Sequence, residues 1–160
     1  MQLGQGPNVI KNLADDMEMG KRARGIYAIG NTLISKFKHC SISSKILLFK
    51  TYCYNIYANS LWTSFRVNSY AKVKVAHNDI FRSLLKVQRS ESASALFASN
   101  NVFNLDVINR NSMYSLIERL LSSENKFVYN ICNSEVKTHS KIWKRWSVAL
   151  GIEWDSLMRY

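Results

Sequence analysis

The chain has 160 residues, of which 47% are hydrophobic, so it is long and apolar enough for a folded domain with a substantial core. Its formal net charge of +11 favours a polyanionic partner, nucleic acid first and an anionic membrane surface second. A solvated basic surface without a specific partner gives the same charge. The three widely spaced cysteines argue against a disulfide framework and against a cysteine-rich zinc site.

No targeting or membrane segment is recognisable in the sequence. The first ten residues lack the charged and apolar regions of a signal peptide, and the longest strongly apolar run, residues 46–49, is too short to cross a bilayer. We therefore expect an intracellular protein, cytoplasmic or nuclear, with no membrane partner.

Residues 31–150 contain neither glycine nor proline, which disfavours tight hairpin turns and favours helices joined by Ser- and Asn-rich links. A first helix is predicted over residues 14–38, because apolar residues recur there at steps of three and four. Its expected core stripe consists of Ile26, Ile29, Leu33 and Phe37. The opposite side of the same helix is polar and basic.

A second helix is predicted to reach about residue 63, with Ser43 or Ser44 as its N-cap. It is apolar over a wide arc, so we expect it to be the most buried helix, with Cys53 as a small core residue. A third helix is predicted over residues 69–87. Its apolar stripe comprises Val73, Ala76, Ile80, Leu84 and Val87. His77 falls on the apolar side, where a histidine is usually a hydrogen-bonded core residue.

The remaining segments also favour helices. Residues 90–101 predict a short helix, residues 105–122 a longer one, and two more short helices are expected around residues 127–131 and 142–149. The predicted fold class is therefore all-α, a multi-helix bundle of about five to seven helices with a short irregular N-terminus.

The segment LADDM, with Asp15 and Asp16, raises the question of a polymerase metal site. A polymerase carboxylate pair lies at a turn between strands and needs a further carboxylate upstream to hold two metal ions. No acidic residue precedes Asp15, and a charged, helix-like stretch follows Asp16. We interpret Asp15, Asp16 and Glu18 as favourable negative charge at a helix N-terminus. The three histidines are scattered, so no nucleophile–base pair is indicated.

Several motifs, in order and at approximate spacing, are similar to one family of polymerases. They are LG at 3–4, YAIGNTLISKF at 27–37, KILLFKTYCYNIYANSLW at 45–62, VAHNDIFRSLLKVQR at 75–89, SASALF at 92–97 and, more weakly, MYSLIERLLSSEN at 113–125. With these motifs the chain resembles the region after the catalytic palm in reverse transcriptases of LINE-type (non-LTR) retrotransposons. The segment LGQGPNVI departs from the family, whose members continue a strand there.

The resemblance implies a thumb-like helical domain over residues 1–125, followed by a C-terminal helical extension over residues 126–160. It implies a fragment of an RNA-directed DNA polymerase that contains no catalytic residues, metal ligands or cofactor site of its own. Its expected partners are an RNA–DNA or DNA duplex, bound without sequence specificity, and the palm and fingers portion of the polymerase. The alternative is a degenerate structural or interaction fragment with no nucleic-acid function.

The candidate phosphate contacts lie on the basic faces of the first and third predicted helices. They are Lys21, Arg24, Lys38, Arg82, Lys86 and Arg89. For each of them the alternative interpretation is a solvated helix face. The sequence gives no role to Trp143, Trp146 and Trp154.

Overall fold

The computed structural model describes residues 7–56, 59–63, 65–134 and 139–151, with side chains from residue 16 onward in these ranges. The described residues contain seven α-helices, one short 3-10 helix and no β-strand, which confirms the predicted all-α class. Of the irregular N-terminus expected before residue 14, residues 1–6 lie outside the described part of the chain and residues 7–13 belong to the first helix. None of the described helices combines the length and the hydropathy that crossing a membrane requires.

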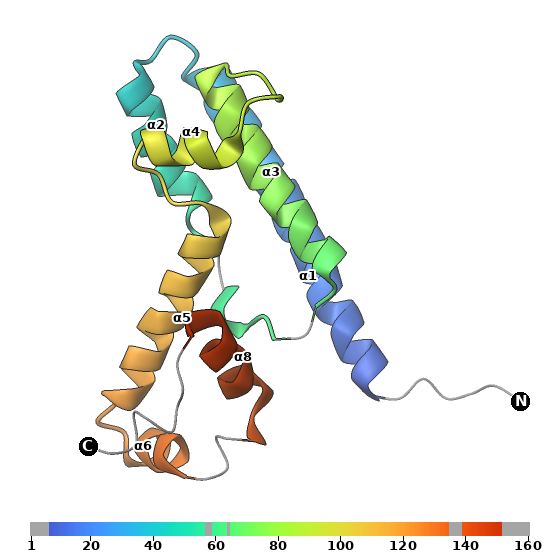
Figure 1. Cartoon of the computed structure of the whole chain (residues 1–160), viewed down its shortest axis with the longest axis vertical. Helices are drawn as coiled ribbons and strands as arrows, with labels where there is room; N and C mark the ends of the chain where they lie inside the picture. Colours follow the sequence, from blue (N-terminus) through green and yellow to red (C-terminus); the bar gives the residue numbers. More distant parts are fainter. Residues whose placement is uncertain (1–6, 57–58, 64, 135–138, 152–160) are drawn as a thin grey trace, which may run out of the picture. The chain divides into compact units, whose positions relative to one another are not determined.

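The helices follow one another with short connections (Figure 1). Their bounds are α1 Pro7–Lys36, α2 Ile42–Cys53, η1 Asn59–Leu61, α3 Val67–Leu85, α4 Ala93–Ser99, α5 Leu105–Leu121, α6 Lys126–Asn133 and α8 Lys141–Leu150.

The chain forms two compact units. Unit 1 consists of Met1–Tyr57 and Ser64–Asp106, and unit 2 consists of Ala58–Thr63 and Val107–Tyr160. α5 therefore begins in unit 1 and continues in unit 2. The family resemblance implies a boundary at residue 125, which is based on similarity to a polymerase region and not on compactness. That boundary stays a prediction.

Unit 1 is built on α1 and α3, which run side by side in the same direction (Figure 1). Val73, Ala76, Ile80 and Leu84 of α3 are buried, so the predicted stripe of this helix is confirmed up to Leu84. These side chains, one or two per turn, keep a single face of α3 against its neighbours.

The core stripe of α1 differs in part from the prediction. Ile26 and Leu33 are buried as expected, but Ile29 is 41% exposed. Met19 and Ala23, which precede Ile26, and Gly30, which follows Ile29, are also buried. Ala23 and Gly30 are small, which allows two helices to approach closely.

Gly30 is where α1 and α3 come closest. A Cβ atom at this position would lie less than 3.0 Å from three carbon atoms of the Ile80 side chain, whereas a Cβ at Gly25 would meet nothing within 4 Å. Ile80 itself is buried and cannot move aside freely. The glycine is therefore required by packing, because any larger residue overlaps with α3.

Three predictions about α2 are wrong. Its N-cap is Ser41, whose hydroxyl accepts a hydrogen bond from the backbone N–H of Ser44 at 3.2 Å, and the helix ends at Cys53. It is also not the most buried helix, since Leu47 is 65% and Tyr52 is 53% exposed. α3 buries more side chains. Cys53 is buried, as expected, and burial raises the pKa of its thiol to about 11.

His77 lies in an aromatic cluster at the centre of unit 1. The rings of Phe49, Tyr54 and Phe97 lie 4.9, 6.4 and 5.4 Å from its imidazole, measured between centroids. The imidazole is fully buried, and among the described residues neither of its nitrogens has a hydrogen-bond partner. The expectation of a core histidine is confirmed, but the expected hydrogen bond is not formed. Burial lowers the pKa of His77 to about 4.

Unit 2 has its own apolar core, which gives the tryptophans a role. Met113, Ile117 and Cys132 pack with Trp143 and Trp146. The two indole rings meet edge to face, and Trp146 Nε1 donates to the backbone carbonyl of Ser60 at 3.0 Å. Trp154 lies outside the described residues.

Candidate nucleic-acid interface

All six candidate phosphate contacts belong to unit 1, where most of the excess positive charge is found. Fourteen of the 22 Lys and Arg residues and six of the 11 Asp and Glu residues lie in this unit, so it carries +8 of the net +11. Five of the candidates are exposed, and Arg82 is half-buried. The structure divides them among three places on the surface of the unit.

Lys21 and Arg24 lie on different flanks of α1. Lys21 lines a cavity of about 370 Å³ beside the C-terminal end of α2, together with Ile29, Tyr52 and others. Arg24 lines a larger groove of about 630 Å³ between α1 and α3. The two cations therefore line different depressions, although they lie only three residues apart on α1.

The groove between α1 and α3, here called the α1–α3 groove, has a basic pair above a floor of small residues. It is lined by Gly20, Ala23, Arg24, Tyr27, Asn68, Ala71, Lys72 and Val75. Arg24 comes from α1 and Lys72 from α3, and both are exposed. The sequence placed Lys72 on the polar face of its helix but did not single it out. Its pairing with Arg24 depends on how α1 and α3 are aligned. The spacing of residues within one helix gives no information on that alignment.

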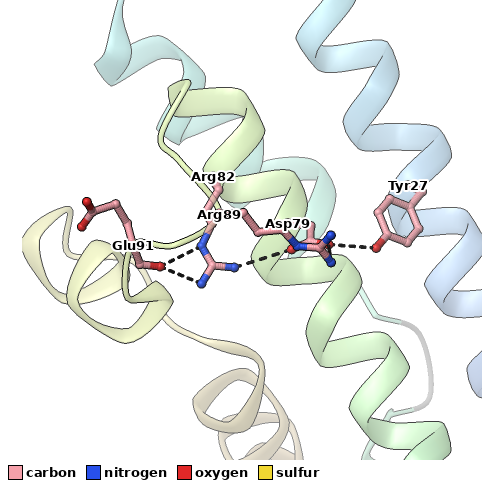
Figure 2. Close-up of polar contacts among 5 residues, drawn as sticks. All are labelled: Tyr27, Asp79, Arg82, Arg89 and Glu91. Carbon is pink, nitrogen blue, oxygen red and sulfur yellow. Dashed lines mark hydrogen bonds and ion pairs between the residues drawn. The ribbon is translucent and has the colours of Figure 1, made fainter.

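Beside this groove, Asp79 gathers two of the candidate arginines (Figure 2). Its carboxylate lies 2.9 Å from Nη2 of Arg89 and 3.5 Å from Nη1 of Arg82, and it accepts a 3.3 Å hydrogen bond from the Tyr27 hydroxyl. Arg82 also donates from Nε and Nη2 to the backbone carbonyl of Glu91, at 3.1 and 2.8 Å. Arg82 thus fixes the connection between α3 and α4.

The Asp79 cluster also changes how Tyr27 ionises. Burial, and next the negative charge of Asp79, raise the pKa of the Tyr27 hydroxyl, so it stays protonated and continues to donate. Tyr27 lines both the α1–α3 groove and the 250 Å³ cavity beside Asp79. The two features are therefore neighbours on one surface of unit 1.

Lys38 and Lys86 follow the C-terminal ends of α1 and α3. Cations there interact favourably with the carbonyl groups that end a helix, which is a structural role independent of any ligand. Lys86 has a left-handed backbone, with φ of 59°, and its N–H contacts the carbonyls of Arg82 and Ser83. It closes α3 in the manner that glycine usually does.

The interpretation of Asp15 and Asp16 as charges at the start of α1 is wrong. α1 begins at Pro7, so both residues lie in its third turn. The side chain of Asp15 is outside the described part of the structure. Asp16 accepts a hydrogen bond from the backbone N–H of Arg66 at 3.0 Å, directly before α3, and its carboxylate lies 3.3 Å from the Arg66 guanidinium. Asp16 therefore caps the neighbouring helix instead of its own.

The environment of Asp16 favours its charged form. The backbone N–H of Arg66, followed by a weaker hydrogen bond from Ser69, lowers the pKa of this carboxyl despite partial burial. Its contribution to stability is thus present above the unfolded-state pKa and is lost as the pH falls through the lower folded-state value.

Removing this cap is expected to lower the melting temperature. Asp16→Ala leaves the Arg66 N–H without its acceptor. Asp16→Asn keeps an oxygen there, so its melting temperature should lie between those of Asp16→Ala and the parent. Glu18→Ala is the matched control, because it removes a carboxylate from the same helix whose ion pair in the described structure, with Arg22 four residues later, is partly exposed. Thermal unfolding followed by circular dichroism tests this, and equal losses for Asp16→Ala and Glu18→Ala would refute the capping role.

Among the side chains that the structure describes, no three from His, Cys, Asp and Glu lie close enough together to share a metal ion. Comparisons with protein-family models, with curated proteins and with solved structures give no match.

Proposed function

We propose that the chain is a helical nucleic-acid-binding module that holds the phosphate backbone without reading base sequence. The observation that carries this proposal is the α1–α3 groove, in which Arg24 and Lys72 face a common channel from two helices. Lysine and arginine contacts to phosphates supply affinity and position but no sequence information.

The floor of the groove supports the same function. Gly20, Ala23 and Ala71 are small, so a sugar–phosphate backbone can approach the helices closely between the two cations. The groove volume of about 630 Å³ leaves room for several backbone atoms. The concentration of positive charge in unit 1 attracts a polyanion to this surface from a distance.

We further propose that this module belongs to a polymerase, as its resemblance to the post-palm region of LINE-type reverse transcriptases implies. In that setting unit 1 acts as a thumb-like element on an RNA–DNA or DNA duplex, and the palm and fingers are its protein partner. The all-α architecture and the basic face formed by two parallel helices support this assignment.

Removing the two groove cations is expected to weaken binding and its dependence on salt. If about three to six phosphates are neutralised, log affinity falls with log salt at a slope of roughly −3 to −5. Arg24→Ala with Lys72→Ala removes up to two of these contacts, so the slope should be shallower by about 2. Fluorescence anisotropy with a short RNA–DNA duplex, at several salt concentrations between about 50 and 200 mM, measures both quantities.

The matched control changes the net charge equally in unit 2. Lys126→Ala with Lys144→Ala removes two exposed lysines and should leave the slope close to that of the parent. A groove variant that binds like this control, or a parent whose binding ignores salt, contradicts the proposal.

A second candidate function, a packing fragment, is favoured by exposed apolar side chains on α2. Ile42, Leu47 and Tyr52 are all more than half exposed there. Apolar side chains left exposed on a helix can be covered by a protein partner. Salt-independent behaviour in the titration above would favour this candidate, because apolar association does not depend on counterion release.

A further inference from the structure

We propose that Asp79 competes with phosphate for Arg89. It holds Arg89 in the free protein and releases it to a backbone phosphate when a polyanion binds. This inference rests on the proposed function, and it names the residue that regulates the affinity of the same surface.

The two arginines at Asp79 are held very differently (Figure 2). The Arg82 side chain is 15% exposed, and two of its nitrogens are already engaged by the Glu91 carbonyl. Moving Arg82 would leave that carbonyl without both donors and loosen the connection between α3 and α4. Arg82 is therefore a fixed structural residue.

Arg89 is bound only at its tip. Its side chain is 78% exposed, and within the described structure its one polar contact is a single nitrogen on Asp79, at 2.9 Å. An ion pair whose arginine is exposed in this way contributes little to stability, because water solvates the guanidinium when the pair opens. A phosphate with its own negative charge can replace Asp79 as the partner of Arg89.

Asp79 is not left without partners when Arg89 departs. Its carboxylate is 19% exposed, keeps the Tyr27 hydroxyl at 3.3 Å and remains beside Arg82 at 3.5 Å. The exchange therefore adds one free cation to the surface without burying an unpaired carboxylate. Because Tyr27 also lines the α1–α3 groove, the released Arg89 extends that surface beyond Arg24 and Lys72.

Asp79→Asn tests the competition, since the amide retains an oxygen for Tyr27 but no longer carries the charge that holds Arg89. We expect this variant to bind a short RNA–DNA duplex about two- to fivefold more tightly than the parent, the range that corresponds to an exposed ion pair. Asp106→Asn is the control, because it removes one carboxylate of a different ion pair, with Lys74, in the same unit.

The double variant Asp79→Asn with Arg89→Ala separates release of Arg89 from a general loss of negative charge. If Arg89 carries the gain in affinity, the double variant should bind the duplex no more tightly than Arg89→Ala alone. If the carboxylate only repels the duplex, the double variant should still bind more tightly than Arg89→Ala. Arg89→Ala alone changes an exposed residue, and it should make the salt slope shallower by about 0.9, one phosphate contact.

The outcomes distinguish this inference from the proposed function. If the parent binds with a salt-dependent affinity and Asp79→Asn tightens binding only in the presence of Arg89, both stand. If the parent binds but Asp79→Asn has no effect, matches Asp106→Asn, or keeps its gain without Arg89, the inference is overturned and the proposed function stands. If the parent does not bind the duplex, both are overturned.

Discussion

Replacing Gly30 with alanine is expected to destabilise the protein by about 3 kcal/mol, the upper part of the range for overpacked cores. The added methyl group would lie less than 3.0 Å from three carbon atoms of Ile80, which is buried and tightly packed. α1 and α3 would have to move apart along the contact that organises unit 1. The gain in helix propensity from glycine to alanine, about 1 kcal/mol, offsets only part of this effect.

Gly25→Ala is the matched control for this prediction. It makes the same chemical change five residues earlier in α1, where a Cβ atom meets nothing within 4 Å. This variant should be more stable than the parent by about 0.5 to 1 kcal/mol, because alanine favours the helix. Urea unfolding monitored by circular dichroism gives the free energies of unfolding for both variants.

A double-mutant cycle assigns the effect to Ile80. Ile80→Ala removes the atoms that the new methyl group meets, so Gly30→Ala should be less damaging in that background than in the parent. Equal stability of Gly30→Ala and Gly25→Ala, or equal effects of Gly30→Ala in the two backgrounds, contradicts a close approach of the helices at this position.

Periodicity within one helix could be read directly from the sequence. The stripe of α3 from Val73 to Leu84 repeats so regularly that its core face followed from spacing alone. The start of α1 differs from the prediction, because the acidic pair at 15–16 lies inside the helix and Pro7 is a residue type favoured in a first helical turn. The sequence could also have suggested Ser41, which lies three residues before the N–H it caps.

Contacts between helices could not be read in this way. Asp16 with Arg66, Gly30 with Ile80, and Arg24 with Lys72 each join residues about 50 positions apart, and nothing local specifies how α1 and α3 are aligned. The same applies to Arg82. Its place on a polar helix face predicted a solvent-exposed cation, but its partner is a backbone carbonyl in the loop beyond α3. The helix face on which each candidate cation lies was thus predictable from the sequence. Whether that cation is free to contact a ligand was not, because its partners come from other parts of the fold.

Acidification is expected to destabilise the protein through His77 at pH values well above those that protonate its exposed carboxylates. The imidazole is fully buried among Phe49, Tyr54 and Phe97, and burial lowers its pKa from 6.5 to about 4. The unfolded chain therefore binds a proton on His77 more readily than the folded protein does. Stability is complete above about pH 6.5 and falls as the pH decreases toward about 4, by about 3 kcal/mol.

His77→Leu removes this dependence, because leucine has a similar volume and no titratable group. Its unfolding free energy should stay flat between about pH 6.5 and 4, apart from the carboxylates that both proteins share. At neutral pH the variant should be as stable as the parent or more stable by about 1 kcal/mol, since two buried nitrogens without hydrogen-bond partners in the described structure are replaced by apolar atoms.

His39→Gln is the matched control, because it replaces a histidine at an exposed position, in the turn after α1. Urea unfolding at a series of pH values gives the three profiles. Asp16, whose ordinary pKa of 3.8 is lowered further, loses its contribution only at more acidic pH, so the two effects occupy different windows. A parent profile that matches that of His77→Leu would mean that His77 finds a proton acceptor or water in the folded protein, and that the aromatic cluster is not closed around it.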